Sequence, residues 1–365
     1  MEFQIEKSEF IRGLRLASSI ADRKSTMPIL ANVLLRTNKN NRLAVVATNL
    51  LCSIVIELDA KIEGEGAITV GAKSLHEIVS GLPGDAVKFS VAENGFAVVT
   101  SKKSSYKLVG MGASDFPKVP DWQGVEYGKV DPKVMVSMID KVMPAISTDE
   151  SRAHLAGCLY ESDGENSVMV STDGHRLAKI VESTMGSPKL KNGIIIPRKG
   201  LSEIKHVLES ANGPVDVGFK DSLFIKSGAV VLSIKPIDAQ FPPYNEVVPK
   251  NNPNHASVDR REFFEALKRT SLMVSRDGGV KVSLEKDIMQ VSGDNPERGE
   301  AHETLDLEYP GKPMAVSFNA KYMLEFLGEM SAEKVSLELD SETDPVVIRP
   351  AGDNSYLCII MPMRI

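Results

Sequence analysis

The segment Ser171-Thr172-Asp173-Gly174-His175-Arg176-Leu177 brings a hydroxyl, a carboxylate, an imidazole and a guanidinium into one short stretch. Such groups suggest a hydrolase in which Thr172, Asp173 and His175 form the reacting set. Two observations argue against that hypothesis. Neighbouring residues on a strand point to opposite faces, so Thr172 and Asp173 would not converge. The sequence also has no Gly-x-Ser-x-Gly elbow and no second acid placed to orient His175. Enzymatic chemistry is therefore disfavoured.

The composition is that of a folded protein of two or three domains. The chain has 365 residues, of which 42% are apolar and 25% charged, with a formal net charge of −6. As an average, this charge argues against membrane surfaces and against extended nucleic-acid patches. Cys52, Cys158 and Cys358 lie far apart in apolar runs, which indicates buried reduced thiols. We expect no cofactor, no metal and a cytoplasmic location, because no signal-peptide or membrane-span pattern is present.

The sequence patterns predict the same order of secondary-structure elements three times along the chain. Each copy begins with an amphipathic helix; these are expected at 8–17, 134–142 and 263–269, with Ser8 and Asp259 as N-caps. A strand pair follows, at 32–37 with 43–48, 156–160 with 167–172, and 279–284 with 288–292. A second helix is expected at 73–79, 198–204 and 321–327. A closing strand pair is expected at 96–100 with 106–109, 223–225 with 230–234, and 346–348 with 356–360.

The spacing of these copies predicts an α+β fold of three tandem similar domains, each with two helices packed on antiparallel sheets. Proline after a strand blocks its continuation, so Phe116-Pro117 and Phe241-Pro242 mark the ends of the first two copies. The expected domains are 1–122, 128–250 and 251–365.

Three such domains could stack linearly or close into a ring. With helices about 9 Å apart, the helices of two chains fit on a circle about 34 Å across, which leaves about 24 Å after helix thickness is subtracted. That bore admits a nucleic-acid duplex, roughly 20 Å wide by its groove depths. The regions around helices 8–17, 198–204 and 263–269 are mildly basic in an acidic protein, as contacts to phosphates without base readout require. A linear docking scaffold without DNA remains the alternative.

Several motifs resemble the bacterial β sliding clamps, the processivity subunits of DNA polymerase III, and the resemblance runs from end to end. The motifs are Thr172-Asp173-Gly174-His175-Arg176-Leu177, Pro197-Arg198-Lys199-Gly200, Phe241-Pro242-Pro243-Tyr244, Asn295-Pro296-Glu297 and Met361-Pro362-Met363-Arg364. The resemblance implies a non-catalytic head-to-tail homodimeric ring of six domains around duplex DNA. The implied partners are the polymerase catalytic subunit, a clamp loader, and other polymerases and repair proteins that bind through a short peptide motif.

The resemblance also implies site residues. The partner-peptide groove would be formed by Leu155, Thr172, Gly174, His175, Arg176, Leu177, Pro242, Val247, Val346, Ile360, Met361, Pro362, Met363 and Arg364. DNA would be contacted by Lys24, Arg152, Arg198 and Lys199, and the dimer interface would contain Tyr106, Leu108, Leu272 and Met273. The chain departs from the family pattern at Glu246, where a basic residue is expected, at Ala153-His154, at Ile365 and in the acidic segment 341–345.

Overall fold

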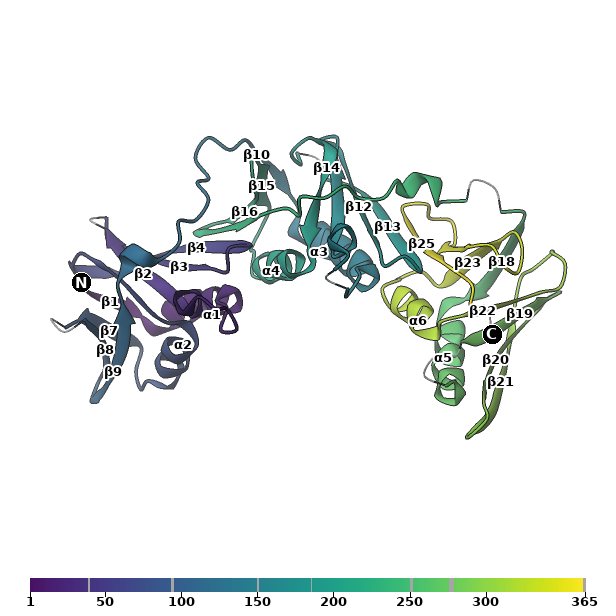
Figure 1. Cartoon of the computed structure of the whole chain (residues 1–365), viewed down its shortest axis with the longest axis horizontal. Coiled ribbons are helices and arrows are strands. Elements are labelled where there is room, and N and C mark those ends of the chain that lie inside the picture. Colours follow the sequence, from purple (N-terminus) through teal and green to yellow (C-terminus); the bar gives the residue numbers. More distant parts are fainter. Residues whose placement is uncertain are drawn as a thin grey trace. The chain divides into compact units, whose positions relative to one another are not determined.

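The computed structural model describes residues 1–38, 40–92, 95–149, 151–184, 186–249, 252–275 and 279–363. These residues form two compact units, which are described separately (Figure 1). The first unit contains Met1–Lys133, Met185–Pro188 and Lys199–Pro236, and the second contains Val134–Thr184, Lys189–Arg198 and Ile237–Ile365.

The secondary structure repeats three times in the order strand, helix, a set of strands, helix and three closing strands. The first repeat contains β1 Glu2–Glu6, α1 Lys7–Ile20, β2 Asn32–Asn38, β3 Arg42–Thr48, β4 Cys52–Asp59, β5 Lys61–Gly64, β6 Ala67–Gly71, α2 Ala72–Gly81, β7 Ala86–Val91, β8 Phe96–Ser101 and β9 Ser104–Met111. The second contains β10 Tyr127–Val130, α3 Pro132–Val142, β11 Gly157–Ser162, β12 Asn166–Thr172, β13 Arg176–Ser183, β14 Leu190–Pro197, α4 Arg198–Glu209, β15 Val215–Phe219, β16 Leu223–Ser227 and β17 Val230–Ile234. The third contains β18 Asn254–Asp259, α5 Arg260–Thr270, β19 Val280–Glu285, β20 Ile288–Asn295, β21 Gly299–Asp306, β22 Met314–Phe318, α6 Ala320–Gly328, β23 Lys334–Leu339, β24 Val346–Pro350 and β25 Tyr356–Ile360.

All the predicted helices and strand pairs are confirmed, and each repeat contains strands that the patterns did not predict. The α+β fold of three similar tandem repeats, with helices on antiparallel sheets, is therefore confirmed. Among the unpredicted strands, β4 is buried on both faces for most of its length, so it lacks the alternation that marks a half-exposed strand.

Helix packing follows the predicted apolar faces. Phe10, Leu14 and Ala17 of α1 are fully buried, α1 packs against α2, and α5 packs against α6 (Figure 1). Asp259 caps α5 as predicted, because its side chain accepts a hydrogen bond from the backbone N–H of Glu262 at 2.9 Å. The prediction for Ser8 was wrong: it lies inside α1, whose N-cap is Glu6.

Neighbouring repeats are joined by antiparallel ladders. In the first unit β4 pairs with β17, within a sheet ordered β10-β15-β16-β17-β4-β3-β2-β6-β9-β8-β7-β1-β5. In the second unit β13 pairs with β25, within a sheet ordered β14-β11-β12-β13-β25-β24-β23-β18. A separate sheet has the order β21-β20-β19-β22. Each ladder joins the fourth strand of one repeat to the last strand of the next, so the strands of the central repeat are divided between the two units.

Two strands that correspond to the strands of the internal ladders have an open edge among the described residues. β21 corresponds to β4 and β13 but is paired only with β20. β9 corresponds to β17 and β25; it pairs with β8, and with β6 only at Met111 and Gly110. Open edges expose unpaired backbone N–H and C=O groups, which are suited to pairing with another strand.

The three cysteines are buried free thiols. Burial raises the pKa of Cys52 to about 12 and that of Cys358 to about 12, and it also raises the pKa of Cys158. These thiols are protonated at neutral pH and pack as small apolar side chains. Among the described residues, no helix combines the length and apolar character that a membrane crossing requires.

Candidate partner-docking site

The segment that suggested enzymatic chemistry forms a hydrogen-bonded turn between β12 and β13. The Thr172 hydroxyl donates to the carbonyl of Arg176 at 2.7 Å and accepts from the N–H of Gly174 at 3.1 Å. The Asp173 carboxylate accepts from the N–H groups of His175 and Arg176 at 2.9 and 3.0 Å. Gly174 has a φ of +93°, a conformation that favours glycine. The hydroxyl and the carboxylate therefore close the turn and do not face a shared substrate position.

The β13–β25 ladder brings this turn against the C-terminal segment. Arg176 is paired with Ile360 and Leu177 with Ile359. Beyond the ladder, the N–H of Met361 donates to the carbonyl of His175 at 2.9 Å, and the N–H of Met363 donates to the carbonyl of Ser317 at 2.7 Å. The Thr172–Arg176 turn and the Met361–Met363 segment, predicted as opposite walls of one groove, are thus adjacent.

An apolar cluster lies beneath both walls. Its buried members are Leu159, Val170, Leu177, Ile195, Phe241, Tyr244, Val347, Leu357 and Ile359, with Val168, Ile237 and Val248 packed against it. Tyr244 is held there by a hydrogen bond from its hydroxyl to the Glu161 carboxylate at 2.7 Å, and the Lys179 ammonium lies 5.2 Å from the centre of its ring. Tyr244, Glu161 and Lys179 were missed as supporting residues, although Tyr244 belongs to the Phe-Pro-Pro-Tyr motif.

The predicted groove residues divide into a buried base and an accessible surface. Leu155, Leu177, Val346 and Ile360 are buried, so they support the site from below. Val247 and Met361 are 46% and 41% exposed. Gly174 and His175 are also exposed, whereas Thr172, Pro242, Pro362 and Met363 are half-buried. Arg364 lies outside the described residues.

Arg176 was predicted to line the groove, and the structure shows a buried side chain that is fully engaged. It is 8% exposed. Its Nε donates to the Asp173 carboxylate at 3.0 Å, and its terminal nitrogens donate to Glu325 on α6 and to the carbonyl of Pro144. The guanidinium also stacks 4.2 Å from the ring centre of Tyr322. Glu325 and Tyr322 could not be found from local sequence because they lie far from Arg176 along the chain.

The two internal ladders differ in polarity at corresponding positions. At the β13–β25 ladder, Leu177 faces Ile359, whereas at the β4–β17 ladder Ser53 faces Ser233. The Ser233 hydroxyl donates to the backbone carbonyl of Ser53 at 3.3 Å. The β13–β25 junction is therefore apolar at positions where the β4–β17 junction has buried, hydrogen-bonded hydroxyls.

The residues expected to contact DNA occupy loops and a helix start. Lys24 and Lys199 are exposed. Arg152 is half-buried and donates to the carbonyl of Asp173 at 3.1 Å. Arg198 is half-buried and donates to the carbonyl of Ile146 at 3.1 Å. The two lysines thus present free surface charge, whereas each arginine also has a structural hydrogen bond.

The residues expected at a dimer interface lie on or near the open edges. Tyr106 on β9 is 45% exposed, and Leu272, in the 3-10 turn Ser271–Met273 after α5, is 67% exposed. Leu108 and Met273 are half-buried. Apolar side chains exposed to this extent beside unpaired strand edges are typical of an interface.

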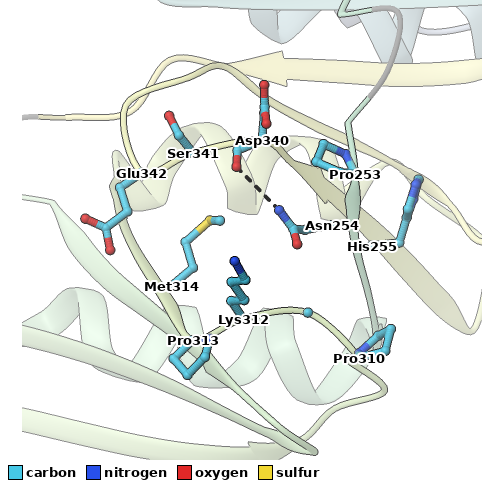
Figure 2. A pocket seen from close by; sticks show the side chains of 11 residues that line it. Pro253, Asn254, His255, Pro310, Lys312, Pro313, Met314, Asp340, Ser341 and Glu342 are labelled. Atoms are coloured by element: carbon cyan, nitrogen blue, oxygen red, sulfur yellow. Dashed lines mark hydrogen bonds between the residues drawn. The ribbon is translucent and has the colours of Figure 1, made fainter.

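A separate cavity of about 750 Å³ lies at the edge of β18 (Figure 2). Its lining residues are Pro253, Asn254, His255, Pro310, Gly311, Lys312, Pro313, Met314, Asp340, Ser341 and Glu342. The Asn254 side chain donates to the backbone carbonyl of Asp340 at 3.4 Å, as Figure 2 shows. The acidic stretch expected at the groove rim thus contributes Ser341 and Glu342 to this cavity, and none of the predicted groove residues lines it.

Comparison with known proteins gives one consistent result. Family models of the DNA polymerase III beta subunit match its N-terminal domain at residues 1–120, its central domain at 129–243 and its C-terminal domain at 245–364. The chain is 30% identical to the beta sliding clamp of Vibrio cholerae and 31% identical to that of Caulobacter vibrioides, over 100% of each chain.

Solved structures agree with these matches. The Caulobacter crescentus pol III beta structure has a TM-score of 0.93 at 31% identity, and a Pseudomonas aeruginosa sliding clamp bound to griselimycin has a TM-score of 0.93 at 28% identity. Both comparisons cover 100% of each chain. The chain belongs to the beta sliding clamp family, the beta subunits of DNA polymerase III.

Proposed function

We propose that this protein is a DNA sliding clamp that encircles duplex DNA and tethers the replicative polymerase for processive synthesis. It contributes no chemistry of its own. The observation that carries the proposal is the pattern of ladders: two junctions are closed within the chain, and the corresponding edges of β21 and β9 remain open for a second copy. Pairing β9 of one chain with β21 of another, at both ends, gives a head-to-tail homodimer of six repeats.

The internal ladders suggest the register of the seam between chains. When the repeats are aligned by their buried, core-facing residues, Lys107 on β9 lies opposite Glu300 on the partner copy's β21. Tyr106 lies opposite Ala301 in the same register. The seam would thus have an ion pair where one internal junction has serines and the other has Leu177 and Ile359. Leu272 occupies the position of Ser19 in α1, whose hydroxyl donates to Glu203 of the next repeat at 2.6 Å.

Contacts to DNA are proposed to come from Lys24, Arg152, Arg198 and Lys199, without sequence readout. Phosphate contacts position a protein on a duplex but carry no base information. A sliding ring requires weak local contacts, and the net charge of −6 fits this requirement. Retention on DNA then depends on topology, so it should survive salt concentrations that remove charge contacts.

The groove between the Thr172–Arg176 turn and Met361–Met363 is proposed to bind short apolar segments of the polymerase, the clamp loader and repair proteins. Methionine side chains repack readily, which suits a surface with several partners. We further propose that griselimycin, which the P. aeruginosa clamp binds, also binds here, with Val247 and Met361 as accessible apolar contacts. The proposed domains are 1–122, 128–250 and 251–365, and the proposed location is the cytoplasm.

Retention on circular DNA tests the clamp function. The protein is loaded on nicked circular DNA, washed in high salt, and the circle is then linearised. A closed ring stays on the circle and slides off the linear product. Equal loss from both forms would favour the linear docking scaffold, which shares the repeats and the groove but has no topological hold on DNA. Monomer mass at micromolar concentration would count against the ring independently.

A further inference from the structure

The turn at the docking groove has a counterpart in the first repeat with the same hydrogen bonds. In the Thr48–Cys52 turn, Asn49 accepts from the N–H groups of Leu51 and Cys52 at 3.1 and 2.7 Å. Asp173 makes the same two bonds in the Thr172–Arg176 turn. The position of Arg176 is occupied by Cys52 in the first turn. The turn therefore forms without a guanidinium, so Arg176 is not needed for its local conformation.

Of these two turns, only the Thr172–Arg176 turn is bound through its last residue to a helix of the following repeat. Arg176 contacts the Glu325 carboxylate and the Tyr322 ring, both on α6. Glu203 occupies the position in α4 that Glu325 has in α6, and it accepts instead from the Ser19 hydroxyl on α1 at 2.6 Å. The Arg176–Glu325 ion pair is thus present at the β13–β25 junction, which has the apolar base. At the β4–β17 junction, which has the paired serines, the Ser19–Glu203 hydrogen bond takes its place.

We propose that Glu325 and Tyr322 are positioning residues for the docking groove, which they hold in its binding geometry through Arg176. The inference rests on the proposed docking function. One wall of the groove comes from the second repeat and the other from the C-terminal end of the third, to which α6 belongs. A buried guanidinium bound to both repeats fixes the distance between the walls. A pre-formed groove loses less conformational freedom when it binds a ligand.

Calorimetric titration with griselimycin tests this role in the full-length protein. Glu325→Ala is expected to weaken binding about tenfold, in the range typical of coupling energies. Glu325→Gln keeps an oxygen acceptor for Arg176 and should recover most of the loss. Tyr322→Leu, which removes the stacked ring without changing charge, should weaken binding in the same direction. Lys321→Ala is the control: Lys321 is 74% exposed and pairs with the same carboxylate at 3.8 Å, so its loss should leave affinity within twofold.

A double-mutant cycle separates positioning from general destabilisation. Lysine lacks the planar fork that contacts Asp173, Glu325 and Pro144 together, so Arg176→Lys should weaken binding by itself. In that background Glu325→Ala should cause little further loss, and the dimer mass measured by analytical ultracentrifugation should stay unchanged in each variant. The proposal is overturned if the affinity of Glu325→Ala lies within twofold of wild type. It is also overturned if Glu325→Ala causes an equally large loss of affinity in the Arg176→Lys background. If the wild-type protein does not bind griselimycin, the proposed docking site itself is refuted, and the positioning role is refuted with it.

Discussion

Tyr244 shows how one buried hydroxyl supports an apolar surface. It is 9% exposed, and its hydroxyl donates to the Glu161 carboxylate. Burial, followed by this hydrogen bond and the negative charge of Glu161, raises the pKa of Tyr244 to about 12. The protonated form is thus favoured in the folded state, because an ionised phenolate would face a carboxylate in an apolar environment.

This raised pKa predicts a loss of stability in alkali. The contribution of Tyr244 is fully present below the unfolded-state pKa of about 10, and it falls as the pH rises towards 12. The loss should be on the order of 2 kcal/mol. Chemical denaturation at a series of pH values, read beside tyrosinate absorbance, measures it. Tyr244→Phe should be less stable at neutral pH and should lack this part of the alkaline loss; an identical alkaline profile in both proteins would contradict the assignment.

At the residue scale, the sequence predicted which segments meet but not how each side chain is used. The Thr172–Arg176 turn and the Met361–Met363 segment were predicted to share a groove, and they are adjacent. The burial of Arg176 was not predictable, because it depends on Glu325 and Tyr322 from a distant helix. Long-range ion pairs leave no local periodicity, so a polar motif of this kind suggests an exposed binding residue or a catalytic group.

The conformation of the β12–β13 turn depends on a glycine. Gly174 has a φ of +93°, and a Cβ there would lie 3.0 Å from a guanidinium nitrogen of Arg152. Gly174→Val should therefore destabilise the protein by about 1–3 kcal/mol through backbone strain, with further loss from the displaced arginine. Thermal unfolding and griselimycin titration should both show the effect.

Gly228 provides a matched control for that substitution. It lies in the β16–β17 turn with a φ of +55°, and a Cβ there would meet nothing within 4 Å. Gly228→Val keeps the unfavourable backbone conformation without the steric contact, so it should cost less stability and leave griselimycin affinity unchanged. Equal effects at both positions would show that Arg152 plays no part.

Element prediction found the helices but missed both a strand covered on two faces, β4, and half-exposed strands such as β1 and β7. The helices were found because their apolar faces repeat with helical period, as in Phe10, Leu14 and Ala17. β4 was missed because its first five residues are all buried and show no alternation, so the strand is covered on both sides for most of its length. The division of the central repeat between two units was also invisible, since it arises from ladders between repeats.

At the scale of the whole molecule, the proposed seam predicts a charge-reversal experiment. Lys107→Glu would place like charges opposite Glu300 at both seams of the ring, so the dimer should dissociate at higher protein concentration. Exposed pairs contribute about 0.2–1 kcal/mol each, which predicts a several-fold weaker dimer. Adding Glu300→Lys should restore it with reversed polarity. Analytical ultracentrifugation measures the change, and failure of the second substitution to restore the dimer would contradict the register.

The apolar part of the seam gives a stronger effect. Tyr106→Ala together with Leu272→Ala should yield monomers at micromolar concentration, because two exposed apolar side chains lose their burial against the partner copy. The monomer should still bind griselimycin, since the groove lies within one chain, but it should not remain on circular DNA. Loss of griselimycin binding in this variant would show that the groove requires the assembled dimer.

The two open edges differ from each other, so a copy added to a chain leaves one edge of each kind unpaired. Such head-to-tail contacts produce filaments unless the last copy pairs with the first and closes a ring. Closure of the ring after two copies therefore has two effects. It encircles DNA, and it stops the addition of further copies. Substitutions that alter the angle between repeats without weakening the edges should yield open polymers, detectable by light scattering and absent when β9 cannot pair.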